Sequence, residues 1–171
     1  MEPGEALSTA AQIAVALAGF AGVVVVFRTE SVHDWSRMDK FRLRLLLSNS
    51  ILPLAFCMFG LLLLTIKPPP AAIWRWCSGF ASLFLFLFAA TTLKAVHDFP
   101  AGQFHAAGAA RFIFYPLFVL GTGVSLLQLY NATILNAFWA FFAAIVVQLV
   151  GAMLQFVRLI LIPRQQESDP N

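Results

Sequence analysis

Amides are the polar side chains best placed for chemistry in this chain, because its long apolar segments hold no carboxylate. No Asp or Glu lies between Asp39 and Asp98, or between Asp98 and Glu167. Proton-coupled transporters usually relay protons through a buried carboxylate, and cation pores often use rings of acidic side chains. The sequence therefore gives little support to either class of protein.

Four polar residues stand out within the apolar segments. Gln148, Gln155 and Arg158 share one face of a helix at 100° per residue. Asn49 lies four residues before Pro53, whose ring displaces the carbonyl of residue 49 from the helical ladder. One hypothesis is that these amides bond each other across helices as packing contacts. The other is that the four residues line a hydrated cavity or, in an oligomer, a pore for anions or neutral solutes with Arg158 as a basic ring.

The stretch 95–111 contains the one cluster that could bind a metal or move protons. His97 and Asp98 are adjacent there, and His105 follows among Gly and Ala residues. Their spacing matches no zinc-ligand pattern, and loop histidines are commonly solvated. A membrane enzyme using this stretch is the remotest hypothesis, and we predict no catalytic residue, no metal site and no cofactor.

The composition indicates that apolar helices position these residues. Of the 171 residues, 60% are hydrophobic and 11% are charged, whereas soluble domains carry about 25% charged residues. This balance predicts an integral membrane protein with an all-α fold. The net charge of +3 does not indicate nucleic-acid binding, because the basic residues lie at the ends of apolar segments, where they report topology.

Five apolar segments predict a bundle of five transmembrane helices in a single domain, 1–171. Residues 112–162 cannot be one span, because at about 1.5 Å per residue it would exceed 70 Å. Asn131-Ala132-Thr133 is therefore the predicted turn between the last two helices. The expected spans are 6–27, 41–66, 71–93, 112–130 and 134–162.

The distribution of Lys and Arg predicts the orientation of this bundle. With five spans, nine of the eleven basic residues fall on one side, and Lys67 and Arg75 fall on the other. Basic residues are enriched on the cytoplasmic side of membrane proteins. We therefore expect the N-terminus outside and the C-terminus in the cytoplasm, with location in the plasma membrane or a bacterial inner membrane.

The first span carries its small residues on one face. Ala10, Ala14, Ala18 and Gly22 are predicted to pack against another helix, because small side chains let two backbones approach closely. The opposite face holds Ile13, Leu17 and Phe20, which we expect to meet lipid or larger side chains.

The second helix is expected to begin near Arg37, because Ser36 and Asp39 have the spacing of a capping pair. Its first turns would then present Arg37, Lys40 and Arg44 at the membrane surface. A basic cluster of this kind attracts anionic lipid headgroups, and it also serves as a plain stop-transfer anchor.

Three hypotheses on function result. The first is a non-catalytic membrane subunit that acts through helix–helix assembly, with membrane lipids and a homo-oligomer or another membrane protein as partners. The second is the oligomeric pore or carrier, and the third is the enzyme using residues 95–111.

Overall fold

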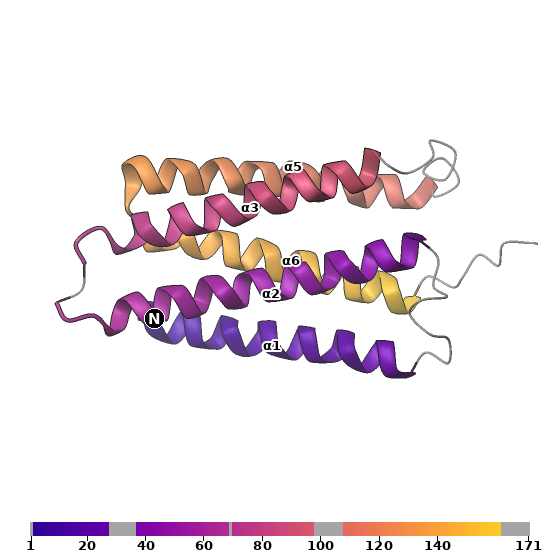
Figure 1. Cartoon of the computed structure of the whole chain (residues 1–171), viewed down its shortest axis with the longest axis horizontal. Coiled ribbons are helices and arrows are strands. Elements are labelled where there is room, and N and C mark those ends of the chain that lie inside the picture. The colour runs from indigo at the N-terminus through magenta and orange to yellow at the C-terminus, as the bar shows by residue number, and fades with distance from the viewer. Residues whose placement is uncertain (1, 28–36, 69, 98–107, 162–171) are drawn as a thin grey trace, which may run out of the picture.

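Long helices run back and forth along one common direction, and each reverses the direction of the one before it (Figure 1). The computed structural model describes residues 2–27, 37–68, 70–97 and 108–161, without the side chains of 24, 38, 108–115 and 158–161. The elements are α1 (Pro3–Phe27), α2 (Arg37–Thr65), α3 (Ile73–His97), α5 (Gly108–Tyr130), the π-helical turn η2 (Asn131–Leu135) and α6 (Phe138–Leu161).

The all-helical prediction is confirmed for the residues described. Five of these helices are long and apolar enough to cross a membrane. The alternating directions create two ends of the bundle. We call the end with Pro3 and the turn between α5 and α6 the turn end, and the end with Phe27 and His97 the loop end.

Several helix boundaries differ from the expected spans. α1 begins at Pro3, α3 runs from Ile73 to His97, and α5 begins at Gly108, so parts of the stretch 95–111 are helical. α2 is helical from Arg37, the first residue described after 28–36, and Ser36 of the predicted capping pair lies outside the described residues. α6 begins at Phe138 and not at residue 134. The reason is Asn136, whose φ of 52° and ψ of 44° place it in the left-handed region and whose N–H donates to the Asn131 carbonyl. Asn tolerates that conformation better than most residues.

The core lies between α1, α2 and α6, and the α3–α5 pair covers one flank (Figure 1). Leu7, Phe56 and Phe141, one from each core helix, are fully buried. At Gly60, α2 lies close against both α1 and α6. An added Cβ there would lie 2.9 Å from Leu7 Cδ1 of α1 and 3.4 Å from Phe141 Cε1 of α6. A methyl group at this position would press on both side chains, and at least the end of Leu7 would have to shift.

Aromatic contacts attach the flanking helix α3 to this core. Phe80 of α3 stacks on Phe59 of α2 with ring centroids 4.4 Å apart. Trp74 of α3 contacts Phe138 of α6 at 4.8 Å. Pairs of this geometry contribute roughly 0.5–1.5 kcal/mol each beyond the area they bury. Both contacts lie in the half of α3 nearer the turn end.

Candidate functional site

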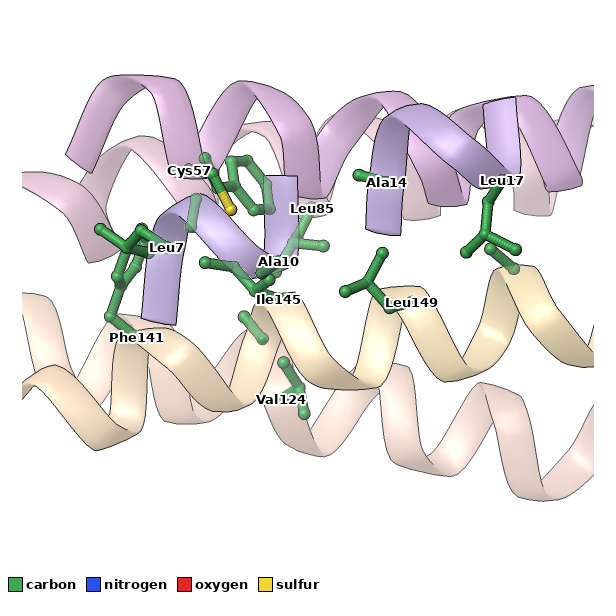
Figure 2. Close-up of a cluster of buried hydrophobic side chains, with 14 of the residues drawn as sticks. Leu7, Ala10, Ala14, Leu17, Cys57, Leu85, Val124, Phe141, Ile145 and Leu149 are labelled. Carbon is green, nitrogen blue, oxygen red and sulfur yellow. The ribbon is translucent and has the colours of Figure 1, made fainter. Parts of the chain in front are cut away.

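The small face of α1 lies against α2 and α6. Ala10, Ala14 and Ala21 are buried, with 3% or less of each residue exposed. Figure 2 shows Ala10 beside Ile145 of α6, with Leu149 one turn further along. The buried strip also includes Leu17, which the sequence placed on the opposite face.

The other two small residues of that predicted face are less covered. Ala18 is half-buried and Gly22 is exposed. A Cβ added at Gly22 would meet nothing within 4 Å. The packed strip of α1 is therefore rotated away from Ala18 and Gly22, toward Leu7 and Leu17.

The amides of α2 and α6 come together within the bundle. An added Cβ at Gly151 would lie 3.6 Å from the Asn49 side-chain nitrogen, which places the Asn49 amide against α6 between Gln148 and Gln155. Both glutamines are buried, at 8% and 4% exposure. The Gln155 Oε1 atom is buried without a hydrogen-bond partner. The side chain of Arg158 lies outside the described residues.

The exposed side of α6 is apolar over the same length. It carries no amide among the described residues and consists of Val146, Val150, Met153, Leu154 and Val157. Gln148 and Gln155 point into their own bundle and would not face a central axis shared by several copies. This arrangement favours the packing hypothesis for the amides over the pore hypothesis.

A hydrogen-bonded polar network joins α3, α5 and α6 near the turn end. Ser78 Oγ donates to Gln128 Oε1 at 2.8 Å, and Gln128 Nε2 donates to the Ala140 carbonyl at 2.6 Å. Asn131 Nδ2 donates to Ser78 Oγ at 2.7 Å and to the Ala137 carbonyl at 3.0 Å. The Asn131 Oδ1 atom accepts from the Ala137 N–H at 2.8 Å. We call Ser78, Gln128 and Asn131, with these backbone groups, the turn network.

All three side chains of the turn network are fully buried. Asn131 opens the sequence Asn131-Ala132-Thr133, which has the form of a glycosylation acceptor. Its nitrogen is occupied by two hydrogen bonds, so this residue serves packing. The sequence pointed to Asn131 as part of a turn, but not to its hydrogen bond with Ser78. The available signal was the four-residue spacing of Ser78 and Ser82, which puts two hydroxyls on one face of an otherwise apolar helix.

A second set of contacts fixes the start of α3 to the same turn. Asn136 Nδ2 donates to the Ala71 carbonyl at 3.0 Å, and its Oδ1 atom accepts from the Arg75 N–H at 3.2 Å. The Arg75 guanidinium donates to the Ile134 carbonyl at 3.1 Å. Asn136 therefore both ends the turn and caps backbone groups of the neighbouring helix.

The predicted basic residues lie at the loop end on the first turns of α2. Arg37, Lys40 and Arg44 are exposed there. Arg42 pairs with Asp39 across one helical turn, with 3.5 Å between Nη1 and Oδ1. Lys94 lies at the same end, whereas Lys67 and Arg75 lie at the turn end. The fold thus separates these basic residues into the two groups expected from the sequence.

The remaining candidate chemistry concerns residues 95–111. His97 is exposed at the end of α3, and Asp98 and His105 lie outside the described residues. Within the described part of the chain, no three His, Cys, Asp or Glu side chains gather as metal ligands would. Comparison of the whole chain with protein-family models, with curated proteins and with solved structures gave no match, so the functional argument rests on its residues.

Proposed function

We propose that this chain is a multi-pass integral membrane protein that acts as a non-catalytic subunit through helix–helix contacts. Its N-terminus lies outside and its C-terminus in the cytoplasm. The apolar side chains exposed on all five helices support insertion in a membrane, and the basic residues gathered at the loop end support this orientation. The exposed aromatic residues Trp76, Tyr130 and Trp139 at the turn end fit an interfacial belt.

The observation that carries the proposal is the middle of α5. None of the residues from Pro116 to Gly123 is buried. Added Cβ atoms at Gly121 and at Gly123 would meet nothing within 4 Å. The two glycines lie about 200° apart around the helix, so this stretch is open on two sides. An open helix surface with a glycine lets another backbone approach closely, which is the usual way helices associate in lipid. A partner helix from another membrane protein or a second copy fits this surface.

The burial of Gln148 and Gln155 supports assembly over conduction. A conducting path needs polar groups along a continuous wall, and these amides are buried within the single chain. The basic residues Arg37, Lys40 and Arg44 anchor the loop end at anionic headgroups in this proposal.

Two glycine substitutions test the proposal without disturbing the chain's own packing. Gly121→Leu and Gly123→Leu extend into open space in the single chain, so an effect reports on a partner. We expect the tagged chain, gently extracted from its native membrane, to show a mass above its own 18.8 kDa by native mass spectrometry. Both variants should shift it toward the mass of the single chain.

Gly79→Leu is the matched control, because a Cβ at Gly79 of α3 also meets nothing within 4 Å. It should leave the complex intact. A wild-type chain that is alone in its native membrane would contradict the proposal, as would steady anion conductance by the purified chain in planar bilayers.

A further inference from the structure

Gln12 of α1 differs from every other amide in the described helices, because it is exposed. Gln128 and Asn131 are fully buried, and Gln148 and Gln155 are buried as well. Asn49 is half-buried against Gly151. The chain thus covers its other helical amides with its own helices. Gln12, in contrast, is accessible to a partner outside the chain.

The depth of Gln12 makes this exposure costly in a membrane. It lies seven residues after Glu5, the last charged residue before the apolar run, which is about 10 Å along the helix. At that depth hydrocarbon offers no hydrogen bond to an amide, and an unpaired amide is strongly disfavoured there. A polar partner on another helix removes this penalty.

The residues that share the face of Gln12 allow another helix to come close. Ser8 precedes it by four residues, Ala16 and Gly19 follow it by four and seven residues, and all three are exposed. A Cβ added at Gly19 would meet nothing within 4 Å. The other side of α1, with Ala10 and Ala14, is already covered by α2 and α6. We call Ser8, Gln12, Ala16 and Gly19 the open face of α1.

We propose that the open face of α1 binds the open face of α1 in a second copy of this chain, in a parallel two-fold contact centred on Gln12. Two copies share one orientation in the membrane, so their first helices are parallel and equal residues lie at equal depth. A two-fold axis along the membrane normal then places Gln12 opposite Gln12. An amide donates and accepts, so the pair satisfies itself.

This inference rests on the proposed function and names one of its partners. The geometry also places Glu5 opposite Glu5 at the outer surface. Those carboxylates are exposed and their repulsion is screened by salt. The self-contact should therefore tighten as the ionic strength rises.

The test measures self-association of the purified chain in lipid nanodiscs or bicelles, by native mass spectrometry and by a dilution series. We expect a dimer of the wild type. Gln12→Leu should weaken it by at least about tenfold, because the cross-helix amide bonds are lost. Gly19→Leu should weaken it similarly by separating the backbones. Gln12→Asn keeps an amide and should retain most of the dimer.

Ile13→Leu is the matched control, since Ile13 is also exposed at the same depth but points about 100° away. It should leave the dimer unchanged. Oxidative crosslinking gives a second measurement, in which Ala16→Cys should form a dimeric disulfide and Ile13→Cys should not. The native Cys57 and Cys77 are buried and do not interfere.

Two results would overturn the inference while leaving the proposed function in place. One is a purified chain that stays monomeric although the native complex responds to Gly121→Leu. The other is a dimer that tolerates both Gln12→Leu and Gly19→Leu. If the native membrane contains only single chains, the inference and the proposed function both fail.

Discussion

The two ends of this bundle are held together by different forces. At the turn end, hydrogen bonds between side chains and backbone groups join α3, α5 and α6, and Gln128 and Asn131 are fully buried and paired. Toward the loop end, the Gln155 Oε1 atom is buried without a partner, and none of the residues from Pro116 to Gly123 of α5 is buried. Directional bonds thus fix the position of the α3–α5 pair at the turn end, whereas the stretch of α5 from Pro116 to Gly123 is at most half-buried.

This difference shows where the chain places its hydrogen-bonded polar side chains. In hydrocarbon an unmet hydrogen bond is costly, so a satisfied network specifies one arrangement of helices more strictly than apolar packing does. The turn end is therefore the fixed part of the fold. The stretch of α5 from Pro116 to Gly123 is not buried by the rest of the chain, which suits contact with a partner.

The largest expected effect comes from removing the centre of the turn network. Asn131→Leu leaves Ser78 Oγ with one partner fewer and leaves the Ala137 N–H without its acceptor, whereas the Ala137 carbonyl keeps its bond from the Phe141 N–H. We therefore expect a loss on the order of 2 kcal/mol in the free energy of unfolding. Reversible unfolding in bicelles measures it. Thr133→Val changes an exposed residue of the same turn, and equal losses in both variants would show that the network does not stabilise the fold.

The sequence predicted the helices well because apolar length and charge placement are local properties. The burial of Ala10 and Ala14 could be deduced from spacing alone. The turn network could not, because Ser78 meets Gln128 only through the register of two helices fifty residues apart. The start of α6 was misjudged because Asn136 adopts a left-handed conformation, which hydropathy does not reveal.

A medium effect should separate the two buried glycines of the described helices, one toward each end of the bundle. At Gly60, close to the turn end, a Cβ would lie 2.9 Å from Leu7 and 3.4 Å from Phe141. Gly60→Ala should therefore cost about 1–2 kcal/mol through overpacking. At Gly151 the nearest atom lies at 3.6 Å, an ordinary contact. Gly151→Ala should be neutral or slightly stabilising, because alanine favours the helix by up to about 1 kcal/mol.

Thermal unfolding of the two alanine variants side by side in the same lipid measures this contrast. Equal destabilisation would mean that the loop-end side of the α2–α6 contact is packed as tightly as the turn end. The two ends would then differ in hydrogen bonding only.

The smallest expected effect concerns Asn49 and Gln155. The Asn49 amide lies against Gly151, one helical turn from Gln155, yet the Gln155 Oε1 atom has no partner. Gln155→Leu alone should therefore be neutral or stabilising, since it removes a buried unpaired acceptor. Because the Asn49 amide lies one helical turn from Gln155, a double-mutant cycle with leucine at both positions should give a coupling of a few tenths of a kcal/mol. Asn49 with Gln128 is the control cycle and should be additive, because Gln128 bonds to α3 and α6. Strict additivity for Asn49 and Gln155 would show that the two amides do not interact, whereas a coupling above about 1 kcal/mol would show a polar contact between α2 and α6 toward the loop end.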